Sequence, residues 1–270
     1  MDLGLTDRVA FVAGASSGLG RAAATRLARE GCTVAICSRS EARIQTAAEA
    51  IAEAAGTPPN RVLPLVCDVT DATAVAEAIA QTVDAFGALH VLVTNAGGPP
   101  SGTATEVDAA DWRAALELNL MSTIHLCTAA RASLEDAAAA DDHARIVMVS
   151  SVSAKQPIPT LALSNTARAG VQGYAKSLAA DLGPKGITVN TVLPGYTQTD
   201  RLTELAASIE ARTGTSRAAV EAAWAEENAL DRLGTPEEFA AAVAFLASQQ
   251  AGYITGTALP VDGGRIKHLL

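Results

Sequence analysis

Aromatic residues are scarce in this sequence. They account for 3% of the chain, although hydrophobic residues reach 49%, because alanine supplies much of the apolar content. Alanine has the highest intrinsic preference for the α-helix, so helices are expected to outweigh strands by length. The 270 residues are enough for one large α/β domain with a well-filled core.

Positive charge is also in short supply. The chain has 29 acidic and 20 basic residues, a formal net charge of −9, and no block rich in Lys or Arg. Nucleic acid and anionic membrane surfaces are therefore not expected partners. No apolar run is long enough to span a bilayer, and the opening MDLGLTDRV lacks the features of a signal peptide. We expect a cytoplasmic protein with a small-molecule substrate.

Patterns that bind metal or form disulfides are missing as well. The sequence has no C-x-x-C spacing, and no histidine stands at ligand spacing from an acidic residue or a cysteine. The cysteines lie in or beside apolar segments, at Cys32, Cys37, Cys67 and Cys127. We expect buried free thiols and no metal site.

What the sequence does contain is a regular alternation of short apolar runs and alanine-rich segments. The runs are RVAFVAG, CTVAICS, RVLPLVC, HVLVTNAG, RIVMVSS and ITVNTVL. Helices are expected near 18–30, 41–55, 72–86, 110–138 and 162–182. Because the runs are apolar almost throughout, they indicate strands that helices cover on both faces. Repeated βα units predict a single-domain, Rossmann-type, doubly wound parallel sheet.

One long segment departs from this alternation. Residues 197–233 lie between ITVNTVLPG and RLGTPEEF, and they contain Trp224 and a surplus of glutamates. A long excursion from the carboxyl end of a strand in an open α/β sheet usually covers the ligand crevice. We expect a helical substrate lid at about 197–233, and the alternative is an oligomer contact.

The first apolar run leads directly into a glycine motif, AGASSGLG. Its glycines, Gly14, Gly18 and Gly20, stand between an expected strand and an expected helix. In that context they allow a tight turn, and they bring backbone N–H groups and the positive end of the helix dipole against a pyrophosphate. The spacing is G-x-x-x-G-x-G, which differs from the G-x-G-x-x-G of other dinucleotide folds.

Four further motifs accompany the glycine motif: CDVTD at 67–71, TNAG at 94–97, NTVLPGYTQT at 190–199 and YITGTALPVDGG at 253–264. Together they resemble the short-chain dehydrogenase/reductase family, in particular its branch of 3-oxoacyl-carrier-protein reductases, over practically the whole chain. The resemblance implies an NAD(P)-dependent oxidoreductase that is commonly a homotetramer. It also implies cofactor contacts from Gly14, Ser16, Ser17, Gly18, Leu19, Gly20, Asp68, Val69, Asn95, Ala96, Gly97, Pro194, Gly195, Thr197 and Thr199.

The end of the second apolar run bears on which dinucleotide binds. The resemblance places the adenosine ribose at Ser38, Arg39 and Ser40. A carboxylate there would repel a 2′-phosphate, whereas a guanidinium flanked by hydroxyls can bind one. NADP(H) is therefore favoured over NAD(H). The alternative, that Arg39 is an ordinary surface arginine, draws some support from Ser17, where many NADP-preferring relatives have a basic residue.

The catalytic motif of the family is incomplete. The resemblance implies a serine at the end of the fifth strand and an asparagine on the preceding helix, and Ser151 and Asn119 match them. It also implies a tyrosine thirteen residues after the serine and a lysine four residues later. Those positions hold Ser164 and Arg168. Because i and i+4 lie on one face of a helix, both side chains should point toward the cofactor, and Arg168 can contact it.

These two replacements change the chemistry. A tyrosine ionises near pH 10 and is open to activation, whereas an aliphatic hydroxyl is far less acidic. Arg168 stays protonated, so it can bind ribose hydroxyls or a substrate anion but cannot relay a proton. Tyr196, at the expected nicotinamide site, and Lys155, four residues after Ser151, are candidate replacement donors.

Three functions are therefore considered, in this order. The first is an NADP(H)-dependent oxidoreductase of a carbonyl, alcohol or activated enone, in which Ser151, Ser164, Arg168 and water polarise the substrate. The second is a cofactor-binding enzyme for elimination, isomerisation or cyclisation. The third is a non-catalytic binding protein.

Overall fold

The computed structural model of the chain describes residues 2–141 and 143–269. Within these ranges the strands form one seven-stranded sheet in the order β3-β2-β1-β4-β5-β6-β7, and every neighbouring pair is parallel. The expected doubly wound parallel sheet is confirmed. The strands are β1 (Val9–Ala13), β2 (Thr33–Ser38), β3 (Val62–Val66), β4 (Val91–Thr94), β5 (Ala144–Val149), β6 (Ile187–Pro194) and β7 (Ala258–Val261).

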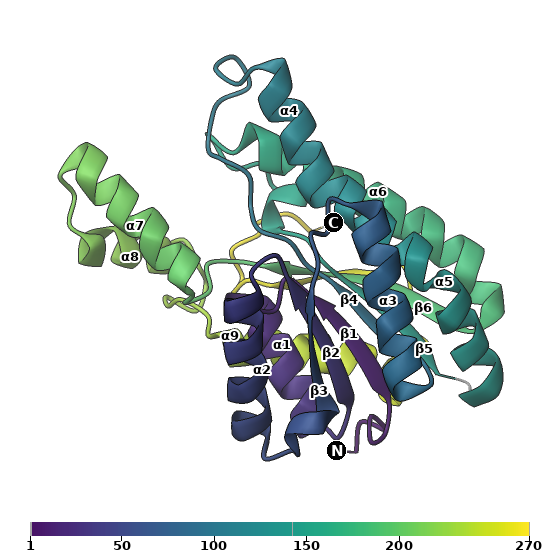
Figure 1. Cartoon of the computed structure of the whole chain (residues 1–270). Coiled ribbons are helices and arrows are strands. Elements are labelled where there is room, and N and C mark those ends of the chain that lie inside the picture. The colour runs from purple at the N-terminus through teal and green to yellow at the C-terminus, as the bar shows by residue number, and fades with distance from the viewer. Residues whose placement is uncertain (1, 142, 270) are drawn as a thin grey trace.

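Helices cover both faces of this sheet (Figure 1). One face packs against α1 (Gly18–Arg29), α2 (Glu41–Ala55) and α9 (Pro236–Ala247). The other packs against α3 (Ala72–Phe86), α5 (Ser122–Asp141) and α6 (Ala162–Leu182). Alternate residues of β1 enter the two cores, and all five of its residues are buried. Burial on both sides explains why the strands are apolar without alternation.

The helix expected at 110–138 is interrupted. The structure has α4 (Ala109–Leu116), then a π-helical turn, η2 (Glu117–Met121), and only then α5. Ser122 Oγ donates to Leu118 O at 2.5 Å, and Thr123 Oγ1 donates to Asn119 O at 3.1 Å. These side-chain bonds offer the backbone carbonyls an alternative partner at the point where the turn widens. The prediction of one uninterrupted helix was wrong at this turn, which carries Asn119.

The segment expected to be helical at 197–233 contains two helices, α7 (Asp200–Thr213) and α8 (Arg217–Glu226). They project from the layered body as a hairpin (Figure 1). The hairpin has a small core of its own, in which Ala206, Val220 and Trp224 are buried. The short 3₁₀ turns are η1 (Pro59–Arg61), η3 (Val152–Ala154), η4 (Gly183–Lys185) and η5 (Gln249–Ala251).

Three further features of the described residues bear on the expectations above. All four cysteines are buried and free. No group of three or more His, Cys, Asp or Glu side chains in the described ranges is placed to hold a metal ion. None of the helices found between residues 2 and 269 combines the length and apolarity that crossing a membrane requires.

Candidate active site

A cavity of about 360 Å³ opens at the carboxyl ends of β1, β4, β5 and β6. The strand order reverses between β1 and β4, and ligands of open α/β sheets bind at such a reversal. The walls of the cavity come from the β1–α1 turn, the segments that follow β4, β5 and β6, the first turns of α6, and the start of α7. The sheet thus brings together segments from the whole length of the chain.

Close backbone packing shapes the β1–α1 turn. Gly14 and Gly18 have φ angles of 60° and 54°, a region that glycine enters without the strain of a side chain. A Cβ at Gly20 would lie 2.4 Å from the carbonyl oxygen of Gly14, so only glycine lets α1 start this close to β1. Asn95 Nδ2 donates to Ala13 O at 3.3 Å and to Gly14 O at 3.1 Å, which holds the turn from the β4 side.

The N-terminus of α1 is open to a ligand. Ser17 occupies the N-cap position but its side chain makes no capping bond, and the first turn has no acidic residue. By contrast, Ser40 and Asp71 cap α2 and α3 through their side chains. The first amides of α1 are thus left for an anion, and they fit the pyrophosphate of a dinucleotide.

The structure brings most of the predicted cofactor residues to this one cavity. Those in its wall are Gly14, Ser17, Gly18, Leu19, Asn95, Ala96, Gly97, Arg168, Pro194, Gly195, Thr197 and Thr199. Ser16 and Gly20 belong to the same turn outside the wall. The remaining predicted residues lie further along the same edge of the sheet, Ser38, Arg39 and Ser40 after β2, and Asp68 and Val69 after β3.

Ser151 and Ser164 border the cavity from opposite segments, the end of β5 and the first turn of α6. Ser153 connects them. Its backbone N–H donates to Ser151 Oγ at 3.1 Å, and its hydroxyl lies 3.5 Å from Ser164 Oγ. Nothing in the sequence singles out Ser153, because its bridging position depends on how η3 folds back onto α6. Ser153 thus links the two cavity serines from behind the wall, through its backbone N–H on one side and its hydroxyl on the other.

Arg168 lies one turn further along α6 and is buried. Its Nη1 donates to Val149 O at 2.7 Å and its Nη2 to Ala96 O at 3.4 Å. Burial lowers the pKa of this guanidinium to about 10, and the positive charge of Arg201 adds to that effect. Arg168 is therefore still a cation at neutral pH. Within the described ranges it forms no ion pair, so carbonyl oxygens alone contact this buried charge.

Asn119 is buried in η2 and does not border the cavity itself. Its Nδ2 donates to Gly97 O at 2.7 Å, which fixes the segment that follows β4. Its Oδ1 is buried and accepts no hydrogen bond from the described part of the chain. Asn119 thus lies directly behind the cavity wall and has one acceptor to spare.

Comparison with known proteins agrees with this geometry. A family model described as enoyl-(acyl carrier protein) reductase matches residues 14–265. The short-chain reductase protein NovJ of Streptomyces niveus is 37% identical over 259 residues, which are 96% of this chain and 94% of that protein. The chain belongs to the short-chain dehydrogenase/reductase family. It is thereby an enzyme of that family, an oxidoreductase of carbonyl or alcohol groups.

Two solved structures extend the comparison. L-Sorbose reductase from Gluconobacter frateurii, complexed with NADPH and L-sorbose, has a TM-score of 0.92 and 30% identity, and each chain covers 100% of the other. A short-chain oxidoreductase from Pseudomonas aeruginosa PAO1, described as containing an atypical catalytic center, has a TM-score of 0.88 and 35% identity over 98% of this chain and 99% of that one.

The structure does not bring either candidate replacement donor into the cavity wall. Tyr196 stacks on Trp224 with ring centroids 4.9 Å apart, and its hydroxyl accepts a hydrogen bond from Arg265 Nη2 at 2.9 Å. Burial raises the pKa of the Tyr196 phenol. Lys155 is exposed on the loop after Ser151 and is also outside the wall. Tyr196 is next in sequence to the cavity residues Gly195 and Thr197, but its side chain packs against Trp224 of the hairpin, which the sequence does not reveal.

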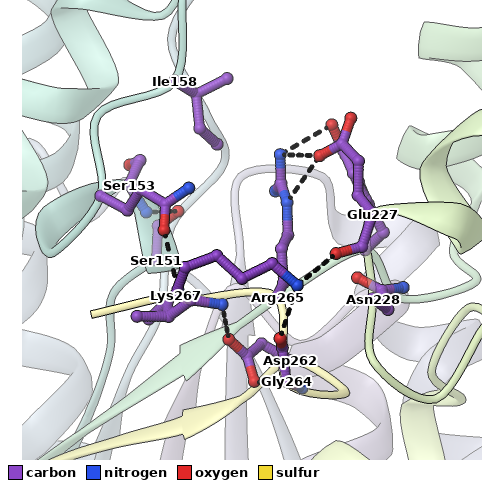
Figure 2. A network of polar contacts seen from close by, with 12 residues as sticks. Ser151, Ser153, Ile158, Glu227, Asn228, Asp262, Gly264, Arg265 and Lys267 are labelled. Carbon is purple, nitrogen blue, oxygen red and sulfur yellow. Dashed lines mark hydrogen bonds and ion pairs between the residues drawn. The ribbon is translucent and has the colours of Figure 1, made fainter. Parts of the chain in front are cut away.

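A polar network joins the C-terminal segment, at Arg265 and Lys267, to the segments beside the cavity. Figure 2 shows Arg265 paired with Glu227, at 2.8 Å between Nη2 and Oε2, beside the base of the hairpin. Lys267 Nζ donates to Glu227 O at 3.3 Å, and its backbone N–H donates to Gln156 Oε1 at 3.1 Å. The C-terminal segment therefore connects the α8 end of the hairpin to the loop that follows Ser151.

Proposed function

We propose that this chain is an NADP(H)-dependent oxidoreductase acting on a small carbonyl, alcohol or activated enone, and that Ser151, Ser164 and Arg168 do the work of the family's serine, tyrosine and lysine. The observation that carries the proposal is that these three side chains border the same cavity as the β1–α1 turn. A site that had lost its chemistry altogether would have no need to keep a buried cation there.

In this proposal the cofactor is held mainly by backbone. The first amides of α1 bind the pyrophosphate, Asp68 and Val69 flank the adenine, and Pro194 to Thr199 border the nicotinamide end. When bound, the nicotinamide group donates or accepts the reducing equivalent. Two solved neighbours that contain NADPH, and a third described as an NADPH-dependent reductase, support a nicotinamide cofactor for this site.

The preference for NADP(H) depends on the end of β2. Arg39 is exposed there, and the hydroxyl of Ser40 accepts a hydrogen bond from Arg43 N at the start of α2. A 2′-phosphate placed beside them would meet a guanidinium, hydroxyl groups and the positive end of a helix dipole. The residue directly after β2 is Arg39 and not a carboxylate, and the first carboxylate, Glu41, comes only at the start of α2.

The remaining residues polarise the reacting oxygen. The hydroxyls of Ser151 and Ser164 donate hydrogen bonds to it, and the charge of Arg168 stabilises negative charge that develops on it. None of these groups is a strong proton donor at neutral pH, because a serine hydroxyl is a weak acid and Arg168 holds its proton, so the proton that completes the product comes from water. The proposed substrate is accordingly an easily reduced carbonyl or enone, with the α7–α8 hairpin as its lid.

The experiment is NADPH oxidation over a panel of ketones, enones and quinones, followed by the double substitution Ser164→Tyr with Arg168→Lys. Oxidation with part of the panel is expected for the natural chain. The double variant is expected to gain activity on simple ketones, because Ser151 and Asn119 are already in place. Ser164→Phe with Arg168→Lys is the matched control, since it restores the ring and the amine without the phenol.

Tight NADPH binding with no oxidation of any panel member would contradict the proposal and favour the non-redox alternative. A double variant that binds NADPH but stays inactive on ketones would show that the substrate side of the cavity has been rebuilt. The homotetramer and the cytoplasmic location also stay predictions. Light scattering tests the tetramer, and a monomer would end that prediction.

A further inference from the structure

A second arginine, Arg201, reaches the cavity from the first turn of α7. Its Nη2 donates to Pro99 O at 3.4 Å, and the same nitrogen lies 2.7 Å from the point where a Cβ on Gly98 would stand. A side chain at position 98 would therefore displace the guanidinium. Gly98, in the segment after β4, therefore leaves room for the guanidinium of Arg201 to pack against the backbone.

Arg168 approaches the same segment from beneath. It donates to Ala96 O, three residues before the carbonyl that Arg201 contacts. The two guanidinium groups act on each other electrostatically, since the charge of Arg201 disfavours the protonated form of Arg168. Two cations from different helices, α6 and α7, thus contact one short stretch of chain.

Little negative charge offsets this pair. Neither Arg168 nor Arg201 is joined to a carboxylate by an ion pair within the described ranges. Asp200 also borders the cavity; it is exposed, as Arg201 is, and it borders two neighbouring surface depressions as well. Carbonyl dipoles satisfy hydrogen bonds without cancelling charge, so a cavity with this pair favours an anionic guest.

We propose that the cavity takes a substrate with a carboxylate, bound by Arg201 at the rim with Arg168 beneath it. The inference rests on the proposed function, which supplies the carbonyl that is reduced. A planar guanidinium matches the two oxygens of a carboxylate in a paired geometry. The apolar side chains beside it, Leu161, Leu202 and Leu205, suit a short hydrocarbon part of the same molecule.

Arg201 could instead bind the pyrophosphate of the cofactor. The experiment distinguishes binding of a substrate carboxylate from binding of that pyrophosphate. Protein saturated with NADP⁺ is titrated by calorimetry with acetate, levulinate and benzoate, each compared with its neutral methyl ester. Three sizes of acid prevent a poor fit of one hydrocarbon from hiding the site. We expect at least one acid to bind about tenfold or more tighter than its ester, the difference that one charge-assisted pair provides.

The variants assign the preference to the guanidinium. Arg201→Met is expected to remove the difference between acid and ester, and Arg201→Lys to retain part of it, because lysine keeps the charge and loses the paired geometry. Arg212→Met is the control, since Arg212 is an exposed cation in the last turn of the same helix. The affinity for NADP⁺ is measured for every variant and is expected to change by less than about twofold, a small fraction of one charge-assisted bond.

Equal binding of acid and ester in all three pairs would overturn the inference. So would a loss of NADP⁺ affinity in Arg201→Met as large as the loss of acid affinity, which would assign Arg201 to the cofactor. These titrations need no turnover, so they are distinct from the test of the proposed function. If acids bind more tightly than their esters but NADPH is never oxidised, only the proposed function is refuted. If ketones are reduced but acids and esters bind equally, only the carboxylate site is refuted.

Discussion

The two sides of the cavity are built in different ways. On the nucleotide side, the shape comes from backbone, with positive φ at Gly14 and Gly18 and close contact at Gly20. On the catalytic side it comes from side chains, chiefly Ser151, Ser164 and Arg168. A backbone cradle tolerates few substitutions, because almost any Cβ would fill it. On a surface built from side chains, residues can be substituted and the chemical groups changed without moving the backbone of the helix that carries them.

This difference fits the proposal that Ser164 and Arg168 stand where the family has a tyrosine and a lysine. α6 runs from Ala162 to Leu182, and both replaced positions still face the cavity. Within the described ranges, the one hydrogen bond from these two positions to a predicted nucleotide-binding residue is that from Arg168 to Ala96 O. The predictions below test whether the two sides respond as independently as their construction suggests.

The largest expected effect follows from Gly20→Ala. The new Cβ would stand 2.4 Å from Gly14 O, so α1 must shift away from β1. We expect a loss of about 3 kcal/mol in unfolding free energy, the upper range for overpacking, and a clear loss of NADPH affinity. Chemical denaturation and NADPH fluorescence measure the two.

Gly173→Ala is the matched control on the catalytic side. It lies inside α6, and a Cβ there meets nothing within 4 Å. Alanine in a helix interior should stabilise the protein by about 0.5–1 kcal/mol. If Gly20→Ala were as harmless as Gly173→Ala, the cradle would not depend on close backbone contact.

A pH titration of stability examines the end of the sheet opposite the cavity. His143 precedes β5 and is buried, and burial lowers its pKa from 6.5 to about 4. The unfolded chain therefore takes up the proton at a higher pH than the folded protein. The stabilisation from neutral His143 is fully present above about pH 6.5 and is lost as the pH falls toward 4, with a decrease of about 3 kcal/mol in unfolding free energy.

His143→Gln should flatten that decrease, because glutamine keeps a donor for Ala247 O and does not titrate. His268→Gln, at an exposed position, should leave that decrease in stability unchanged.

The catalytic rate should respond to pH differently from the stability. Neither a serine nor Arg168 changes charge between pH 6 and 9, so the rate should be nearly flat there and acquire a pH dependence only in the Ser164→Tyr, Arg168→Lys variant. A steep rate profile in the natural chain would reveal another acid or base.

The smallest expected effect concerns the edge of the nucleotide side. Arg39→Asp replaces the proposed phosphate contact with a charge that repels it. We expect the ratio of NADPH to NADH affinity to fall by about tenfold or more, and stability to stay within about 0.5 kcal/mol because Arg39 is exposed. An unaltered ratio would make Arg39 an ordinary surface residue.

Much of this architecture was predictable from sequence because the local signals agreed with the tertiary structure. The expected helices at 41–55 and 162–182 match α2 and α6 residue for residue. The family resemblance supplied the positions of Ser164 and Arg168, and the four-residue step between them predicted that both side chains lie on one face of α6.

The parts that were missed depend on contacts between distant segments. The π turn at Asn119 leaves no trace in the pattern of apolar residues from which the helix was predicted. Arg201 lies inside the expected lid, but its approach to Gly98 depends on where α7 crosses the segment after β4. The same holds for Tyr196, whose hydroxyl is directed by Arg265, 69 residues further along the chain.

The C-terminal segment in Figure 2 has a mechanical consequence. Because Arg265 is paired with Glu227 and Lys267 with Gln156, the hairpin and the loop after Ser151 share one tether. A swing of α7 and α8 away from the sheet must either break that tether or pull the serine loop with it. If the hairpin is the substrate lid proposed above, its opening would also loosen the loop that follows Ser151.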